Sequence, residues 1–535
     1  MRYLQIQLTI TVVVISLFSC CSQKRIAVMM ASTPDLVYDK SEAKGFNNYQ
    51  KDALYLTETI RQAYPRLEEK IPEEIFRKEK ELLLDDLSRM DNDLDFEIRL
   101  QRFMALLHDA HSKVVVDYPM PETGGYPISL FMEKDKWILV NIDRAAADSS
   151  VIGSEIISVN QIPTKEIEVR AGKLESSENI YRTNLIFPPN LRFPSYWKAL
   201  GVSETNGHGN ELHFVVTKDG VEKSFTLYPN AKPKGYPIKA GNTPFTNQQN
   251  NGFYYKTDKD ENYAYLQMNT CLDYVSIKSE IASYTNFFVR PFALSYLKKQ
   301  KKDAMNFGLV LQSLFKEIHE KGIDNLIIDL RYNSGGDERT GKQLLWYLDG
   351  TEDIKGFTPY LNVSDYFRQT VKQDYKKYNK DYQQKYGAKI PGREINLNEE
   401  IYGYNYFNDI TREGSPYLLD ASIPKFKGKV YVLQGSITFS AAQMLATTIA
   451  DNQLAVMVGQ PTGNKPSCQT GSSLCKLPHT KKIVNLSYIY MERPDRSKNS
   501  QDALFPAIEI YPNFQDLIDG NDRAFEYIIK EIKGD

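Results

Sequence analysis

One serine follows an apolar run and could do chemistry. Ser440 lies in the stretch GSITFSAAQML, Gly435 to Leu445, between the apolar run KVYVLQ and a small-residue segment typical of a helix. The first backbone N–H groups of a helix are unpaired and carry a partial positive charge, so they can stabilise an anion. Ser440 is therefore either an ordinary helix N-cap or a nucleophile, and other segments must decide between these roles.

A pair of glycines could complete the surroundings of such a nucleophile. Gly335 and Gly336 follow the apolar strand of LIIDLRYNSGGD, where a backbone without side chains can turn tightly and expose its N–H groups. An N–H of this turn and that of Ala441 could together stabilise the oxyanion that forms when a serine attacks a carbonyl carbon. The alternative is a simple β-turn.

Two segments offer a base that could take the proton of Ser440. Lys465 in GQPTGNKPSCQ becomes a general base if burial lowers its pKa, and Gln469 could then hold its amine toward the serine. His111 in LLHDAHSK follows an apolar helix and could accept the proton instead. Taken alone, Lys465 could equally be a solvated loop residue, and His111 or His108 a helix C-cap.

These segments need an α/β scaffold, which we predict over residues 255–535. Apolar strands alternate there with helical patterns, including a long helical stretch over 275–321 and a helix near 339–347, as in a layered α/β core. An insertion at 355–415 is rich in Tyr, Lys and Asn and predicts a partly helical cap or lid. The chain lacks the G-x-S-x-G elbow of the α/β-hydrolases, which argues against that class.

Two further units are predicted before this core. Residues 45–120 read as helices with two apolar stripes. The stripes are Leu54, Thr57, Ile60 and Tyr64, then Phe96, Leu100, Phe103 and Leu107. Residues 121–232 show short alternating runs and an Asp-Gly turn, which predict a small β-rich module.

Part of this β-rich module resembles a PDZ domain. The stretch IGSEIISVNQIPTKEI is similar to the strand that carries a Gly-Asp-x-Ile motif, although Ser154-Glu155 and Gln161 depart from the pattern. The resemblance implies a surface that grips extended peptides by adding them as a strand. The alternative is a structural module that positions the catalytic part.

The N-terminus predicts export. Residues 1–20 read as a lipoprotein signal peptide, because an apolar stretch too short for a membrane span ends in LFSC, which resembles a bacterial lipobox. Cys20 is then the lipid-modified N-terminus, with Cys21 as the fallback acceptor. The alternatives are a simple secreted chain or an internal apolar segment. We expect a protein of the bacterial cell envelope that meets the membrane through this lipid anchor only.

Composition excludes several other partners. A formal net charge of -2 gives no electrostatic reason to expect nucleic acid. No Cys or His spacing of zinc type occurs, so we expect neither a metal nor another cofactor. Cys468 and Cys475 could form a bridge in an oxidising compartment or remain free thiols, and Cys271 is the third cysteine of the mature chain.

Four segments together, in their order along the chain, resemble one family. LIIDLRYNSGG, GSITFSAAQMLA and GQPTGNKPSCQ are similar to the D-L-R-x-N-x-G-G, T-x-S-A-A/S-E and G-x-x-T-x-G-K-x-x-x-Q segments of the C-terminal processing, or tail-specific, serine peptidases. LHDAHSK is similar to the D-G-H-T segment of their tricorn-core-like relatives. The resemblance implies an α/β core of the ClpP/crotonase type. It also implies a serine endopeptidase that hydrolyses polypeptides through an acyl-enzyme on Ser440.

The resemblance also implies roles for the other candidates. Ala441 and the Gly335-Gly336 turn match the oxyanion donors. Lys465 and Gln469 match the base and its orienting amide in the Ser-Lys branch, whereas His111 matches the histidine of the tricorn-like branch. The PTGNKP loop looks more like the tricorn-like relatives, so we favour His111.

The tricorn-like branch also needs a late carboxylate that orients its histidine. Pro506-Ala507 stands where Pro-Asp is usual, which leaves Asp502 and Glu492 as candidates. The hypothesis from another class is a catalytically silent peptide-binding or scaffolding protein of the same fold. A non-peptidase serine hydrolase such as an esterase is a third hypothesis, which the setting of the nucleophile disfavours.

Overall fold

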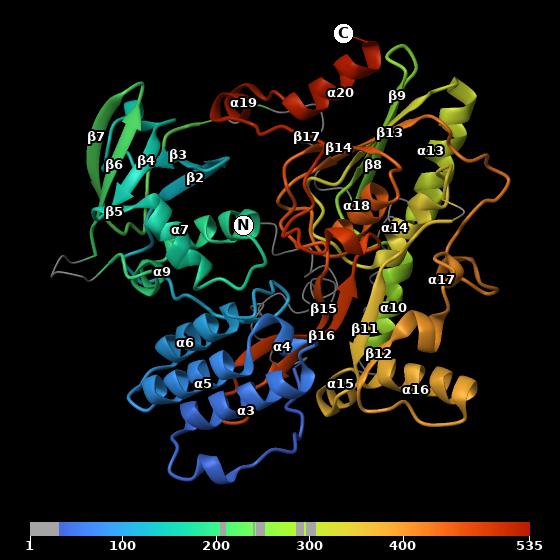
Figure 1. Ribbon diagram of the computed structural model, residues 1–535. Helices are drawn as coiled ribbons and strands as arrows, with labels where there is room; N and C mark the ends of the chain where they lie inside the picture. The colour runs from blue at the N-terminus through green and yellow to red at the C-terminus, as the bar shows by residue number, and fades with distance from the viewer. Residues whose placement is uncertain are drawn as a thin grey trace.

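The chain forms a helical unit, a β-rich module and an α/β core (Figure 1). The computed structural model describes residues 31–203, 210–238, 252–284, 306–351 and 353–534, together with positions 241, 291, 294 and 295. The predicted signal peptide, with Cys20 and Cys21, lies outside the described residues. Within the described part of the chain, no helix has the length and apolar character that a membrane span requires.

A six-stranded sheet forms the α/β core. Its strand order is β17-β14-β13-β10-β9-β8; all neighbours are parallel except β8, which is antiparallel to β9. Its strands are β8 Phe253–Asp258, β9 Tyr263–Met268, β10 Asn325–Asp329, β13 Lys429–Gln434, β14 Val456–Gly459 and β17 Ile508–Glu509. Parallel strands need cover on both faces, which explains why β9 is buried throughout.

Helices cover both faces of this sheet. On one face, Ile328 and Val432 pack with α13 Phe307–Lys321, α14 Glu338–Leu345 and α18 Ala441–Asp451. On the other face, Ile327 and Tyr431 pack against α20 Arg523–Lys533. The predicted layered α/β core is confirmed. The expected helical stretch over 275–321 contains α10 Tyr274–Tyr284 and α13, and part of it lies outside the described residues.

A second, antiparallel sheet joins the core to the rest of the chain. Its order is β1-β16-β11-β12, and β15 also pairs with β16. The strands are β1 Lys113–Val114, β11 Thr358–Asn362, β12 Glu394–Asn396, β15 Cys468–Lys476 and β16 Ile483–Glu492. β1 pairs with β16, so the HDAH segment just before β1 is placed beside the core.

The insertion at 355–415 is partly helical, as predicted, and it also contributes strands to the second sheet. It contains α15 Asp365–Thr370, α16 Lys372–Tyr386 and α17 Asn408–Thr411, but it also adds β11 and β12 to the second sheet. Leu361 and Ile395 of these strands pack with Phe367 and Tyr488 in an apolar cluster. The few apolar residues of this polar segment are therefore used to extend a sheet.

The N-terminal unit consists of helices, as predicted. They are α3 Asn48–Ala63, α4 Leu67–Lys70, α5 Glu73–Leu87 and α6 Asp93–Ala105. Asn47 begins α3 with a capping box to Gln50. All eight residues of the two predicted stripes are buried. The helices pack on the β15–β16 hairpin through Val484 and Leu486, so the helical unit and the core share one apolar cluster.

The module over 121–232 contains an antiparallel sheet, but also helices that the sequence did not predict. Its strands are β2 Ile128–Glu133, β3 Lys136–Ile142, β4 Glu155–Val159, β5 Ile162–Pro163, β6 Leu212–Lys218 and β7 Val221–Leu227. The Asp219-Gly220 turn joins β6 to β7, with positive φ at both residues. The helices are α7 Thr164–Gly172, α8 Ile180–Ile186 and α9 Pro194–Ala199.

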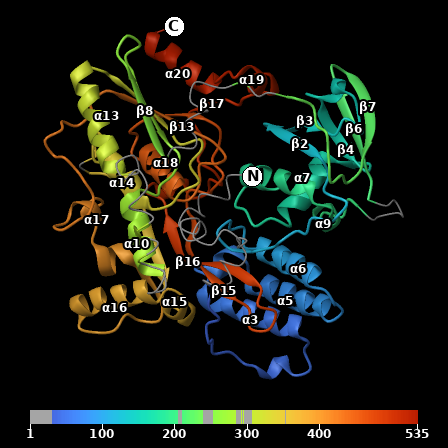
Figure 2. The ribbon, with the colours of Figure 1, turned by 180° about the vertical axis from the view of Figure 1, so that it is seen from behind.

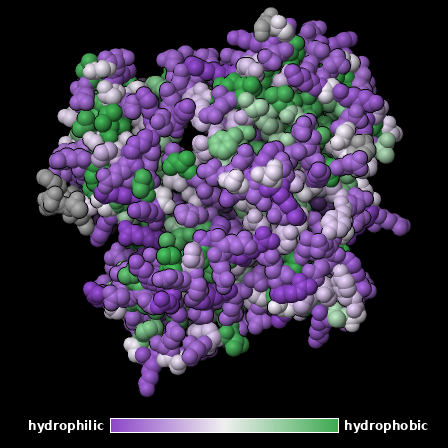
Figure 3. Space-filling model, viewed as in Figure 1, coloured by the Kyte–Doolittle hydropathy of each residue, from purple (hydrophilic) through white to green (hydrophobic). Residues whose placement is uncertain are grey.

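The module and the helical unit lie on one side of the molecule and the core on the other, as the view from behind shows (Figure 2). The helix α19 Phe514–Asp519 connects them at the top, and its Phe514 N–H donates to Glu133 of the module at 2.8 Å. Below this helix the surface is hollowed between the module and the core (Figure 3).

The three cysteines of the described chain are free and buried. Cys468 and Cys475 both lie in β15. An extended strand keeps their Cα atoms on the order of 20 Å apart, whereas a disulfide requires less than about 7 Å. The bridge between them is not formed.

Candidate active site

Ser440 stands where β13 gives way to α18, in a backbone conformation unusual for a side-chain-bearing residue. Its φ is 54° and its ψ is -125°, and its side chain makes no capping hydrogen bond to the helix. Such a conformation is strained and persists only where neighbours hold it. Ser440 N–H donates to Asn464 Oδ1 at 3.0 Å, and Phe439 N–H donates to the Asn333 carbonyl at 3.2 Å. Ser440 thus occupies the N-cap position of α18, but its side chain does not cap the helix and remains available for chemistry.

His111 lies directly beside this serine. Its Nε2 is 3.2 Å from Ser440 Oγ, and its ring stacks on Phe439 with centroids 4.7 Å apart. Asn485 in β16 donates to the His111 carbonyl at 2.8 Å, so the pairing of β1 with β16 fixes the loop that carries the histidine. If Ser440 donates its hydroxyl proton to Nε2, the imidazole must carry its own proton on Nδ1.

The glycine turn lies against the serine, as the oxyanion hypothesis requires. A Cβ atom on Gly335 would be 2.7 Å from Ser440 Cβ and 3.0 Å from the Ala441 nitrogen. The N–H of Gly335 donates to Asn333 Oδ1 at 2.9 Å and is therefore occupied. Within the described residues, the N–H groups of Gly336 and Ala441 have no acceptor. These two are the donors available to an oxyanion.

Lys465 and Gln469 do not form the expected pair. Gln469 lies in β15, and its amide donates to the Pro65 carbonyl at 3.3 Å, toward the helical unit. Among the described side chains, no hydrogen bond connects Lys465 with Ser440 or Gln469. The structure thus places His111, and not Lys465, within hydrogen-bond distance of Ser440.

The carboxylates beside His111 are not those suggested by the sequence. Glu492 pairs with Arg496 at 3.0 Å, and Asp502 is tied through its carbonyl to Asn179. Instead, Asp109 Oδ1 is 3.7 Å from His111 Nδ1. Glu178 belongs to the same cluster, because one donor atom from each of Asp109, His111 and Glu178 lies within 4.8 Å of the others.

Sequence reasoning missed both of these carboxylates. Asp109 lies two residues before His111 in HDAH, so its proximity was a signal that could have been used. Glu178 lies just before α8 in the β-rich module, and no local pattern connects it with the core. Asn464, which bridges Glu178 and Ser440, is in the PTGNKP loop and was also overlooked.

Burial and neighbouring charges set the protonation of this cluster. Burial raises the pKa of Asp109, but the imidazole of His111 and the ammonium of Lys70 together hold that pKa below its usual range. Burial, and after it the negative charge of Asp109, raise the pKa of Glu178. Burial also lowers the pKa of Lys70, whose Nζ donates to the Leu107 carbonyl at 2.9 Å. The pKa of Asp109 is therefore lowered and the pKa of Glu178 is raised, although the two carboxylates belong to one cluster.

Comparison with known proteins agrees with this architecture. The model of peptidase family S41 matches residues 296–510, a stretch that contains the glycine turn and Ser440. No curated protein matches the chain. Residues 296–510 of the α/β core thus resemble peptidase family S41, in agreement with the resemblance of the sequence segments, and the predicted α/β fold is confirmed.

Solved structures resemble the chain over most of its length. Mature CPAF complexed with lactacystin has a TM-score of 0.57 at 14% identity, covering 91% of this chain and 99% of that chain. Mature CPAF has a TM-score of 0.54 at 13% identity, covering 91% and 98%. The photosystem II D1 C-terminal processing protease has a TM-score of 0.37 at 12% identity, covering 89% and 99%. At these identities the likeness to CPAF shows a shared fold.

Proposed function

We propose that this protein is a serine endopeptidase that hydrolyses polypeptides through an acyl-enzyme on Ser440. The observation that carries the proposal is the 3.2 Å distance between Ser440 Oγ and His111 Nε2. Ser440 is partly exposed, so a substrate can reach it, while His111 is only 7% exposed. A serine with an adjacent base and two unoccupied N–H groups beside it has the components that acyl transfer requires.

The steps of the reaction follow from these positions. His111 accepts the proton of Ser440 as Oγ attacks the scissile carbonyl carbon, and the oxyanion accepts hydrogen bonds from the N–H groups of Gly336 and Ala441. The imidazolium then protonates the leaving amine. Water, activated by the same imidazole, hydrolyses the ester and releases the second product. The buried carboxylates behind His111 stabilise its positive charge in both steps.

The finer parts of the proposal concern substrate and location. We place the enzyme among the tail-specific peptidases of the cell envelope, held by a lipid on Cys20. The LFSC segment supports export, and the motif order supports the tail-specific type. The hollow between the β-rich module and the core offers a route for an extended polypeptide (Figure 3).

A fluorophosphonate probe tests the nucleophile assignment. We expect the mature chain to be labelled, and the Ser440→Ala and His111→Ala variants to lose labelling and peptide hydrolysis. Lys465→Ala should keep both. Ser436→Ala, which changes another serine of the same turn, is the matched control. Labelling that survives Ser440→Ala would disprove the assignment, and an unlabelled, correctly folded parent would favour the silent peptide-binding alternative.

An inhibitor provides a second test of the proposed active site. Lactacystin is bound to CPAF in one of the similar structures. We expect it to reduce probe labelling of the parent chain in a concentration-dependent way, because both reagents would compete for Ser440. Unchanged labelling at saturating lactacystin would argue against a shared mode of binding without touching the nucleophile assignment.

A further inference from the structure

Two buried polar atoms behind the Ser440–His111 pair have no hydrogen-bond partner in the described chain. They are His111 Nδ1 and Glu178 Oε2. Both belong to the cluster of Asp109, His111 and Glu178, whose donor atoms lie within 4.8 Å of one another. Buried polar groups are nearly always paired, so two unpaired polar atoms in one small cluster require an explanation.

Asp109, although close, is already committed to other donors. Its Oδ1 accepts the His111 main-chain N–H at 2.9 Å, and its Oδ2 accepts the Ser487 hydroxyl at 2.8 Å. The distance from Oδ1 to His111 Nδ1 is 3.7 Å, beyond a hydrogen bond. Because the backbone and β16 both hold this carboxylate, Asp109 is fixed at that distance.

Glu178 is held differently and keeps one oxygen available. Its Oε1 accepts from Asn464 Nδ2 at 2.9 Å, and Asn464 Oδ1 accepts the Ser440 N–H at 3.0 Å. The neighbouring Asn179 donates to the Thr462 carbonyl at 3.1 Å and to the Asp502 carbonyl at 2.8 Å. These bonds dock the loop before α8 onto the core, so the position of Glu178 relative to Ser440 is defined.

We propose that Glu178, which lies outside ion-pair distance of His111 in this structure, is a positioning residue whose free Oε2 turns to accept the Nδ1–H of His111. This inference rests on the proposed function. The hydrogen bond holds the imidazole in the tautomer whose Nε2 can accept the Ser440 proton. Through Asn464, the same carboxylate also fixes the strained backbone of Ser440. One group from the β-rich module thus controls both members of the catalytic pair, and catalysis depends on docking of that module.

A divalent cation held by the same three residues is incompatible with this role. A metal bound to Nδ1 would leave the imidazole proton on Nε2, and Nε2 could no longer accept the proton of Ser440. Lys70 and Arg182 also place positive charge beside Glu178. We therefore assign the unpaired atoms to a hydrogen bond between protein groups.

Steady-state kinetics of Glu178→Gln test the proposal. The glutamine can still accept from Asn464, but its amide N–H₂ opposes the Nδ1–H of His111 and favours the wrong tautomer. We expect kcat to fall about 100-fold or more with little change in KM, since the equivalent change in a Ser-His-Asp triad costs about 10⁴. Glu178→Asp, which keeps the carboxylate, should recover part of the loss.

Glu175→Gln is the matched control. Glu175 is a buried carboxyl of the same module, where it accepts from Tyr196 at 2.7 Å and does not contact His111. A general weakening of the module would affect both variants, whereas loss of positioning affects Glu178→Gln alone. Equal losses of kcat in the two variants would overturn the proposal.

A spectroscopic readout separates this inference from the proposed activity. Nitrogen-15 NMR of histidine-labelled protein, with His111→Asn to assign the signal, reports the tautomer whether or not the chain hydrolyses peptides. We expect the Nδ1–H form in the parent and a shift toward Nε2–H in Glu178→Gln. A tautomer that changes in Asp109→Asn but not in Glu178→Gln would assign the role to Asp109. A parent that needs added Zn²⁺ and is inactivated by EDTA would also overturn the proposal.

Discussion

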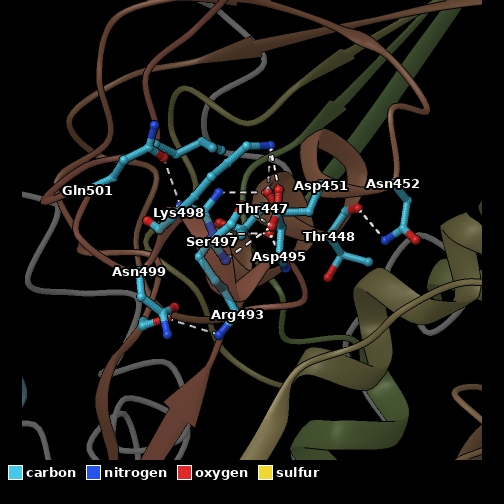
Figure 4. A network of polar contacts seen from close by, with 12 residues as sticks. Thr447, Thr448, Asp451, Asn452, Arg493, Asp495, Ser497, Lys498, Asn499 and Gln501 are labelled. Carbon is cyan, nitrogen blue, oxygen red and sulfur yellow. Dashed lines mark hydrogen bonds and ion pairs between the residues drawn. The ribbon is translucent and has the colours of Figure 1, made fainter.

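The two ends of helix α18 carry buried polar networks of opposite character. At the C-terminal end, Asp451 and Arg493 are each 1% exposed and form a two-point ion pair with distances of 2.6 and 3.0 Å (Figure 4). Arg493 also donates to Gln501 at 2.8 Å, and the Asp495 N–H donates to Asp451 at 3.0 Å. At the N-terminal end, Ser440 has a strained backbone, and His111 Nδ1 and Glu178 Oε2 are unpaired.

The network at the C-terminal end of α18 therefore has a structural role, and the network at its N-terminal end forms the reactive site. Buried charges that are fully paired hold elements in place, here the end of α18 against the loop after β16. Unpaired buried groups and strained backbone cost stability, and they persist where a reaction uses them. The C-terminal end of α18 is thus fixed by the Asp451–Arg493 ion pair. At its N-terminal end, Ser440 and His111 remain available for substrate binding and proton transfer.

Removing the nucleophile should give the largest effect. We expect Ser440→Ala to lower kcat/KM by about 10⁶-fold, as loss of the serine does in other serine peptidases. The thermal midpoint should change little, because the serine side chain makes no capping bond. Peptide hydrolysis together with thermal unfolding measures both quantities. Residual activity within 100-fold of the parent would place the nucleophile elsewhere.

Removal of the Asp451–Arg493 ion pair should mainly reduce stability. Arg493→Met leaves Asp451 buried without its partner, and we expect a loss of about 3–5 kcal/mol in the free energy of unfolding. The double variant Arg493→Met, Asp451→Leu should recover much of this loss, because it removes both buried charges. Urea unfolding of the single and double variants measures the difference. A single variant as stable as the parent would show that the ion pair is not an anchor.

A side chain at Gly335, beside the reactive serine, should affect both activity and stability. In Gly335→Ala the new Cβ would meet Ser440 Cβ at 2.7 Å, and φ at this position is +105°. We expect a loss of about 1–3 kcal/mol in stability from backbone strain and a drop of up to about 100-fold in kcat/KM from displacement of the serine.

Gly414→Ala is the control for this change. Gly414 also has a positive φ, of +73°, but a Cβ there would meet nothing within 4 Å. It should lose some stability and keep the kcat/KM of the parent. Equal activity in the two glycine variants would contradict the close packing of Gly335 against Ser440.

The smallest effect should appear in the pH dependence of stability. The pKa of Asp109 is lower in the folded protein than its usual value, so its stabilising contribution is present above the unfolded pKa and is lost as the pH falls through the folded pKa. We expect Asp109→Asn to lower the thermal midpoint by on the order of 3 °C at neutral pH. Thermal unfolding should show this difference narrowing below about pH 4. A difference that is constant with pH would contradict the ionised state of Asp109.

Local patterns predicted much of the fold. The apolar stripes of the N-terminal helices, the alternating strands and helices of the core and the Asp219-Gly220 hairpin follow from interactions between near neighbours in the chain. The helices α7, α8 and α9 and the pairing of β11 with β16 were missed, because they depend on packing against distant segments. The same limit applies to the carboxylates: Asp502 and Glu492 were suggested, whereas Asp109 and Glu178 lie beside His111.

By itself, the sequence determined that a strand, a turn of small residues and a helix surround Ser440, and that a Gly-Gly turn and two possible bases exist elsewhere in the chain. Only the tertiary structure decided which base lies beside the serine. His111 and Ser440 are 329 positions apart and meet because β1 pairs with β16, while the pairing of β15 carries Gln469 toward Pro65. Proton transfer requires contact between two side chains. Such a contact is set by strand pairing across the whole chain, which no local pattern encodes.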